Sequence, residues 1–224
     1  MQKFATTAPV SAHLDIPAGT IRLIAADQAS GTTVEVLPAN AAKSNDVKAA
    51  EQITVTYADG VLRIEAAEPK SRVLGNSGSV EVTVQLPAGS RVEATTAAAD
   101  FHGVGRLGDV TIDSAQGTVK LDETAAAHLT LQAGDITVGR LGGPAELRTQ
   151  KGDIRITEAL GGAVVLRTES GDLEIGAAHG VSATLDAGTT HGRIANTLQN
   201  SEGSGAGLAI HATTAHGDIT ARSL

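Results

Sequence analysis

Cysteine and tryptophan are missing from this sequence, and the other aromatic residues are reduced to two Phe and one Tyr in 224 residues. Without cysteine the chain forms no disulfide bonds, thiolate metal sites or cysteine nucleophile, which argues against a small disulfide-stapled scaffold. A core without aromatic rings has to be built from Val, Ile, Leu and Ala, and we expect it to be narrow. The length allows one domain or two.

Long apolar runs are also missing. No stretch approaches the about 18 apolar residues that a membrane-spanning helix needs. The start, MQKFATTAPV, has no charged segment followed by an apolar one that would direct export. We therefore expect a cytoplasmic protein, which a membrane protein could recruit to the envelope.

Basic clusters are missing as well. The chain has 17 Lys and Arg and 25 Asp and Glu, which gives a formal net charge of −8. Nucleic acid is therefore not an expected partner, because nothing here would neutralise a phosphate backbone. Arg148 and Arg167 occupy equivalent positions of the repeat described below, and we interpret them as partners of Glu146 and Glu169 rather than as an anion site.

Short segments in which apolar and polar residues alternate make up most of the chain, and this period of two predicts β strands. The clearest local feature is Asp59-Gly60, a dipeptide suited to a tight hairpin turn between the alternating segments 53–57 and 62–64. Residues 44–51 could form a short helical turn capped by Ser44 or Asn45. Residues 66–79 are expected to form an exposed loop.

A repeat of the form Gly-Asp-apolar-x-apolar dominates the chain from residue 92 onward. It occurs at Gly108-Asp109, Gly134-Asp135, Gly152-Asp153, Gly171-Asp172 and Gly217-Asp218, with variants at Gly117-Thr118 and Gly192-Arg193. From Gly117 onward the glycines follow one another after 17 to 25 residues, a length typical of one coil of stacked strands. We therefore expect an all-β protein: residues 1–91 form an irregular antiparallel part, and residues 92–224 form a β-solenoid.

The Gly-Asp pair has a structural explanation that needs no ligand. Glycine lets the backbone turn with positive φ, and the aspartate carboxylate can accept a hydrogen bond from a nearby N–H and hold the bend. The stacking also predicts that Arg155 lies beside Glu174 and that Arg193 lies between Asp172 and Asp218. The predicted structural turn residues are Gly108, Gly117, Gly134, Asp135, Gly152, Asp153, Gly171, Asp172, Gly192, Gly217 and Asp218.

Several motifs in order resemble the bacterial putative-adhesin or toastrack family of β-strand-repeat proteins. They are Phe4 and Pro9-Val10, Pro17-Ala18-Gly19 with Ile21-Arg22-Leu23, Val34-Glu35-Val36-Leu37-Pro38, Gly60-Val61-Leu62-Arg63-Ile64, Leu86-Pro87-Ala88-Gly89-Ser90 and the Gly-Asp repeats. The resemblance covers essentially the whole chain. It implies a solenoid-like β fold that is usually non-enzymatic, often tethered to membrane segments, and linked to adhesion or envelope stress.

Two rows of side chains are weak candidates for metal binding. Stacked carboxylates at Asp135, Asp153 and Asp172 could hold Ca²⁺, although turn capping is the favoured interpretation. His191 and His216 each precede a corner glycine one coil apart, so their rings could stack and take up Zn²⁺ or Ni²⁺. An exposed polar ladder of ordinary histidines is the favoured interpretation of that pair.

Catalytic motifs are absent from the sequence. It contains no Gly-x-Ser-x-Gly elbow and no phosphate-binding loop. Three aromatic side chains are too few for the sugar-stacking groove of a β-helical carbohydrate enzyme. We therefore expect a protein that is not an enzyme, with no catalytic residues and no cofactor.

The open ends of a solenoid carry unpaired backbone groups that pair with another chain unless they are covered. We therefore expect a structural protein that associates with itself, as an oligomer or as a head-to-tail filament. The alternative is a monomeric adhesin-like or envelope-stress module that recognises a protein or polymer of the cell envelope.

Overall fold

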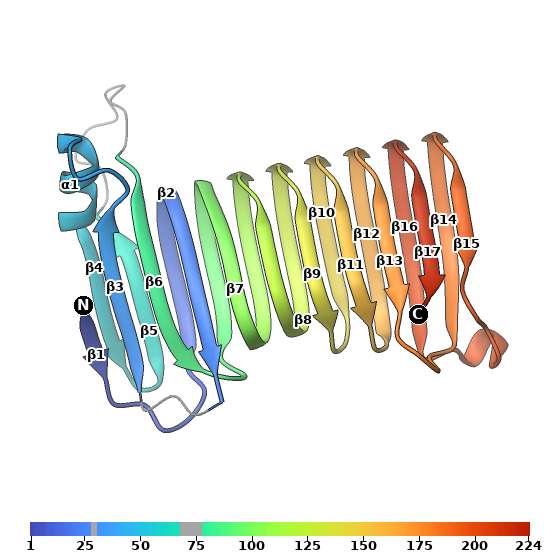
Figure 1. Ribbon diagram of the computed structural model, residues 1–224, viewed down its shortest axis with the longest axis horizontal. Coiled ribbons are helices and arrows are strands. Elements are labelled where there is room, and N and C mark those ends of the chain that lie inside the picture. Colours follow the sequence, from blue (N-terminus) through green and yellow to red (C-terminus); the bar gives the residue numbers. More distant parts are fainter. Residues whose placement is uncertain (28–30, 68–77) are drawn as a thin grey trace. The chain divides into compact units, whose positions relative to one another are not determined.

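The computed structural model describes residues 1–27, 31–67 and 78–224, and the chain forms two compact units, residues 1–116 and 117–224. Both consist almost entirely of stacked β strands, which confirms the predicted all-β, solenoid-like fold (Figure 1). The predicted division into residues 1–91 and 92–224 concerns where the repeat begins, and it stays a prediction. Residues 68–77 of the predicted loop lie outside the described residues.

The described residues of the first unit form seven strands and one helix. They are β1 (Gln2–Phe4), β2 (Ser11–Ala26), β3 (Thr32–Pro38), α1 (Ser44–Glu51), β4 (Ile53–Ala58), β5 (Val61–Ala66), β6 (Val80–Pro87) and β7 (Arg91–Gln116). The long strand β2 joins two ladders, because residues 11–15 pair with β5 whereas residues 19–26 pair with β6. β7 runs parallel to β2 along both parts. The remaining pairs, β1–β3, β3–β6 and β4–β5, are antiparallel.

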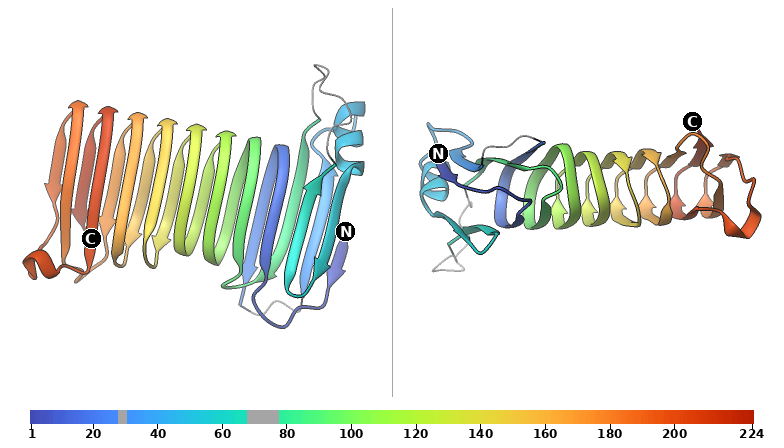
Figure 2. Two further views of the ribbon diagram at one scale, coloured as in Figure 1. Left: turned by 180° about the vertical axis from the view of Figure 1, so that it is seen from behind. Right: turned by 90° about the horizontal axis from the view of Figure 1, so that it is seen from below.

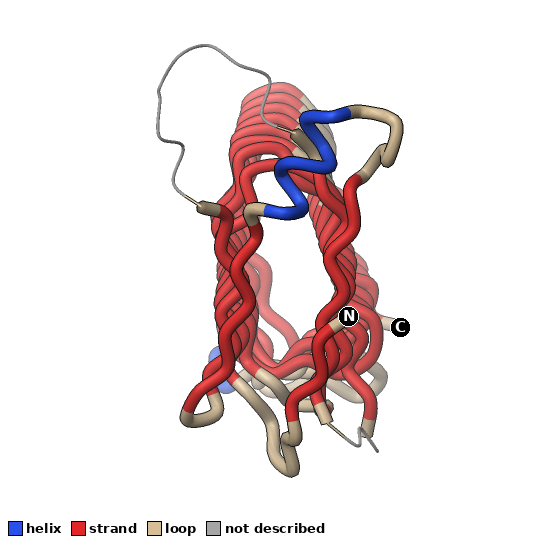
Figure 3. The backbone as a smooth tube through the Cα atoms, turned by 90° about the vertical axis from the view of Figure 1, so that its left-hand side faces the viewer, coloured by secondary structure: helices blue, strands red, loops and turns tan. Residues whose placement is uncertain are grey.

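The predicted hairpin is confirmed, since β4 and β5 pair across Asp59 (φ 51°) and Gly60 (φ 80°). The helix occupies the predicted residues, but the predicted cap is wrong. Lys43 is the N-cap residue and makes no side-chain cap hydrogen bond. The first turn is held instead by buried Asp46, whose Oδ1 accepts a 2.9 Å hydrogen bond from the Ser79 N–H. Figure 3 shows the backbone of α1 in blue.

The rings of Phe4 and Tyr57 pack with centroids 5.4 Å apart. Phe4 ends β1, which pairs with β3, and Tyr57 lies on β4, which pairs with β5. The ring pair therefore bridges the outermost strands of the two ladders of this unit, where an aliphatic core would otherwise be open.

The second unit winds as coils, each with two strands joined at a corner (Figure 2, right). Its strands are β8 (Val119–Ala133), β9 (Ile136–Leu141), β10 (Ala145–Lys151), β11 (Ile154–Ala159), β12 (Gly162–Ser170), β13 (Leu173–Ala177), β14 (Ala183–His191), β15 (Ile194–Thr197), β16 (Leu208–His216) and β17 (Ile219–Ser223). One parallel ladder runs in the order β8, β10, β12, β16, β14. The other runs from the first half of β8 through β9, β11, β13, β17 and β15.

The spatial order of these coils differs from the sequence order. β16 and β17, here called the inserted coil, lie between the β12–β13 coil and the β14–β15 coil, although they follow both in the sequence. The β14–β15 coil, here called the end coil, is therefore the last coil on this side of the described stack.

Candidate functional site: the corner ladder and the end coil

A column of glycines marks one corner of the second unit. Gly117, Gly134, Gly152, Gly171 and Gly217 have φ between +129° and +154°. A Cβ atom on any of the last four would overlap the carbonyl oxygen of the preceding glycine of the column. Each corner therefore needs glycine both for its backbone angle and for the close approach of the neighbouring coil.

The two other predicted turn glycines have a different geometry. Gly192 ends the column against the Gly217 carbonyl oxygen, and its φ is not in the positive region. Gly108 lies within β7 in the first unit, also without positive φ. A Cβ at Gly108 would lie 2.6 Å from the Gly89 carbonyl oxygen, so close backbone packing accounts for glycine there.

The aspartates that follow the glycines form a hydrogen-bonded ladder. Oδ1 of Asp135, Asp153 and Asp172 accepts a hydrogen bond of 2.7–2.9 Å from the backbone N–H of the aspartate in the next coil. Asp218 continues the ladder by accepting a 2.8 Å hydrogen bond from the Arg193 N–H. Each carboxylate thus holds the backbone of the next corner, the role that the sequence favoured over Ca²⁺ binding.

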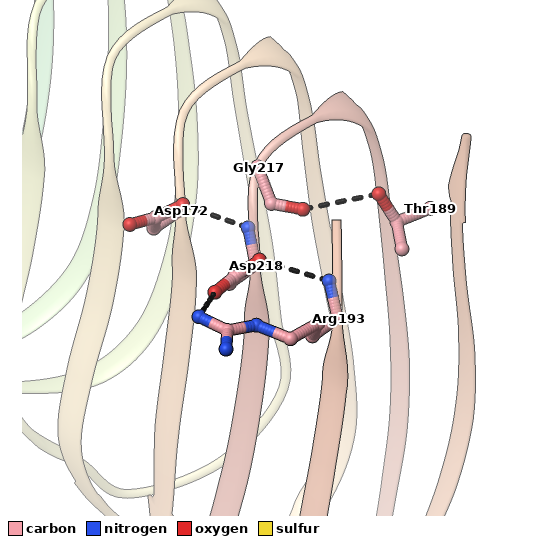
Figure 4. A network of polar contacts seen from close by, with 5 residues as sticks. All are labelled: Asp172, Thr189, Arg193, Gly217 and Asp218. Atoms are coloured by element: carbon pink, nitrogen blue, oxygen red, sulfur yellow. Dashed lines mark hydrogen bonds and ion pairs between the residues drawn. The ribbon is translucent and has the colours of Figure 1, made fainter. Parts of the chain in front are cut away.

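Arg193 ends this ladder (Figure 4). Its guanidinium donates from Nη2 to Asp218 Oδ2 at 3.1 Å. The two hydrogen bonds from Arg193, the backbone one first, lower the pKa of Asp218 below its ordinary value of 3.8. The prediction that Arg193 lies between Asp172 and Asp218 is wrong: Asp218 lies between the other two, because the inserted coil precedes the end coil in space.

A threonine ladder beside the glycines was not predicted. Oγ1 of Thr149, Thr168, Thr214 and Thr189 donates to the carbonyl oxygen of Gly134, Gly152, Gly171 and Gly217, respectively, at 3.0–3.2 Å. Figure 4 shows the last of these contacts. Each threonine precedes a corner glycine by three residues, so the recurring Thr-x-x-Gly pattern was a readable signal.

The candidate histidines are brought together. The rings of His191 and His216 stack with centroids 4.8 Å apart and planes inclined by 14°. On the same pair of strands, His211 Nδ1 lies 3.2 Å from Asp186 Oδ2. Within the described ranges, no group of three His, Cys, Asp or Glu residues could hold a metal ion.

Charged side chains on the outer faces of the coils form ladders. The predicted contact of Arg155 with Glu174 is confirmed at 3.1 Å, and Arg222 approaches Glu174 from the other side at 3.0 Å. Arg148 and Arg167 are register partners, and Arg148 pairs with Glu146 as expected. The expected Arg167–Glu169 pair is not found in the part of the chain that the structure describes, since these side chains make no ion pair there.

The end coil has one open side. β14 pairs with β16 and β15 pairs with β17, and among the described strands no other partner adjoins either of them. Core positions of one column, Val119, Ile136, Ile154, Leu173 and Ile219, are at most 1% exposed, whereas Ile194 at the end of this column is 46% exposed. The end coil therefore presents both unpaired backbone and core-facing apolar surface.

Membrane-spanning helices are not found in the described part of the chain, where α1 is only eight residues long.

Known proteins share the fold over nearly the whole length of this chain. A family model described as Toastrack DUF4097 matches residues 12–223. The structure is similar to that of a putative adhesin from Bacteroides fragilis, with a TM-score of 0.61 and 16% identity over 100% of this chain and 95% of that one. It is also similar to a putative adhesin from Parabacteroides distasonis, with a TM-score of 0.48 and 15% identity over 100% and 95% of the two chains. No curated protein matches the sequence.

Proposed function

This chain belongs to the toastrack family, DUF4097, and from that premise we propose that it is a non-enzymatic structural protein that associates with a second copy of itself through the end coil. The ladder contacts of the end coil all go to the inserted coil: the Arg193 N–H donates to Asp218, and the Thr189 hydroxyl donates to the Gly217 carbonyl oxygen. The other side of the end coil is left for a partner.

The observation that carries the proposal is the exposure of Ile194. Four residues of its column, Ile136, Ile154, Leu173 and Ile219, are buried between register partners on both sides, whereas Ile194 has a partner on one side only. A second chain that covers Ile194 would remove this apolar surface from water, which is favourable by about 25 cal/mol per Å². The unpaired N–H and C=O groups along β14 and β15 would at the same time gain partners.

A symmetric arrangement suits this surface. Two end coils that meet edge to edge in antiparallel orientation use the same residues on both copies, and such an interface closes as a dimer. The outermost strands of the first unit are less suited to pairing, because β1 is three residues long and the Phe4–Tyr57 pair fills the space between the ladders.

The test is light scattering across a concentration series, with negative-stain electron microscopy of the same samples. We expect dimers whose fraction rises with concentration, and we expect Ile194→Lys to abolish them. Leu160→Lys is the matched control, since Leu160 is another exposed apolar residue (36%) but lies outside the end coil. A strict monomer at every concentration, or dimers that survive Ile194→Lys, would overturn the proposal, and open filaments would show head-to-tail contacts instead.

A monomeric adhesin-like module that recognises a protein or polymer of the cell envelope is the second candidate. It is supported by the likeness of the fold to the Bacteroides fragilis protein described as a putative adhesin. A monomer that binds isolated bacterial envelopes in a sedimentation assay would favour this candidate.

A further inference from the structure

The inserted coil occupies a slot between two coils that precede it in the sequence. On one side, Leu208 of β16 is in register with Gly162 of β12, and on the other side it is in register with Ala183 of β14. β17 lies in the same way between β13 and β15. The slot therefore has two complete walls, β12–β13 and β14–β15, each made before the inserted coil in chain order.

The contacts that hold the inserted coil are the same on both walls. The Asp218 N–H donates to Asp172 Oδ1 on one wall, and Asp218 Oδ1 accepts from the Arg193 N–H on the other. Thr214 and Thr189 repeat this arrangement at the glycine carbonyls. These contacts depend on the corner motif of the coil in the slot, and any copy of this chain carries that motif.

Burial explains why the last coil enters the slot. Its core-facing residues Leu208, Ile210 and Ile219 are at most 1% exposed between the two walls. At the same register positions the end coil has the smaller Ala183 in place of Leu208 and the polar Asn196 in place of Ala221. Placing the more apolar coil inside and the less apolar coil at the end buries more apolar surface than the sequential order would.

The connection to the inserted coil is long and rich in glycine. Residues 198–207, LQNSEGSGAG, join β15 to β16 and include three glycines. Ten residues reach about 33 Å when extended, so this connection could span from one molecule to the slot of a neighbour. In the single chain this connection includes a short 3-10 helix, η1 (Gly203–Gly205), and glycine allows other conformations at small cost.

We propose that the slot between β12–β13 and β14–β15 is a binding site for the inserted coil of a second copy, so that two molecules exchange β16–β17 and form a domain-swapped dimer. The exchanged coil makes the same ladder hydrogen bonds and buries the same core residues in either molecule. The exchange uses a surface that is covered in the single chain and is therefore distinct from the open side of the end coil.

The test uses the absence of cysteine from the chain. Ala163 on β12 and Ala209 on β16 are register partners, and neither belongs to the core. Neighbouring strands are about 4.8 Å apart, within the range that a disulfide can bridge. One sample of Ala163→Cys and one of Ala209→Cys are mixed, unfolded, refolded together at high concentration and oxidised, and each single variant alone is treated in the same way as a control.

We expect disulfide-linked pairs in the mixture at several times the level in either control, because only exchange places residue 209 of one chain beside residue 163 of another. The double variant Ala163→Cys/Ala209→Cys is the positive control, because its two cysteines should form a disulfide within one chain. If it does not, the same experiment is done with Arg167→Cys and Thr213→Cys, which are also register partners.

Linked pairs no more abundant than in the controls, with the intrachain disulfide intact, would overturn the exchange. The position of the cross-link separates this result from the proposed function, because two end coils that meet at their open sides do not place residue 163 of one chain beside residue 209 of the other. Dimers that vanish with Ile194→Lys and never link residues 163 and 209 would support the end-coil interface and refute the exchange.

Discussion

Arg193 contacts Asp218 twice, through its backbone N–H at 2.8 Å to Oδ1 and through its guanidinium at 3.1 Å to Oδ2. The preceding corners after Asp135 carry aspartates, and each of their carboxylates accepts a hydrogen bond from a backbone N–H of the next coil. Arginine supplies the N–H that Asp218 needs, but its side chain offers no acceptor to a further coil. The residue therefore completes the ladder and ends it.

Acid should weaken the attachment of the end coil. The pKa of Asp218 is lowered in the folded protein, so the unfolded chain binds this proton more tightly. The ionised carboxylate therefore stabilises the fold at pH values above 3.8, the ordinary pKa of this group. This contribution is lost as the pH falls through the lowered folded-state pKa. We expect Asp218→Asn to have a lower melting temperature than wild type at neutral pH. The two melting temperatures should converge in strong acid. Asp113→Asn, at an exposed position of β7, should show no such convergence.

The aspartate ladder should tolerate asparagine but not alanine. Asp153 Oδ1 accepts the Asp172 N–H at 2.8 Å, and an amide oxygen can accept the same bond. We expect Asp153→Asn to stay near wild type in thermal unfolding and Asp153→Ala to lose about 1 kcal/mol of stability. If the row bound Ca²⁺ instead, the asparagine variant would lose a Ca²⁺-dependent rise in melting temperature that wild type shows.

The corner at Gly152 should reject any side chain. Its φ of +146° is strained for other residues, and a Cβ would overlap the Gly134 carbonyl oxygen. We expect Gly152→Val to lower the free energy of unfolding by at least about 2 kcal/mol in denaturant titration. Gly188→Ala is the control, since Gly188 has open space around its Cβ position and no positive φ. A wild-type unfolding midpoint for Gly152→Val would refute the corner geometry.

The threonine ladder should contribute to stability through its hydroxyl groups. Thr168 is buried, and its Oγ1 donates to the Gly152 carbonyl oxygen at 3.1 Å. Thr168→Val keeps the shape of the side chain and removes the donor, so we expect a loss of about 1 kcal/mol in denaturant titration. Thr213→Val, on the outer face of β16, should change stability far less, and equal losses at both sites would contradict the role of the hydrogen bond.

Features that depend on neighbouring residues or on a constant repeat length could be predicted. Asp59-Gly60 predicted its hairpin because only two residues determine a tight turn. The contact of Arg155 with Glu174 and the stacking of His191 on His216 followed from aligning equivalent positions of the repeat. The threonine ladder was equally regular, but Thr-x-x-Gly acquires meaning only when the threonine is known to face the preceding corner.

Local residue order specifies the coil, because alternating residues decide which face of each strand is buried and recurring glycines decide where the corners lie. It did not determine the order of the coils. The corner motifs at 171–172, 192–193 and 217–218 are compatible in register, so hydrogen bonding permits both the sequential and the observed order. Burial decided between them: the inserted coil buries Leu208 and Ala221, whereas the end coil has Ala183 and the polar Asn196 at these register positions, and this difference acts only once the coils are stacked.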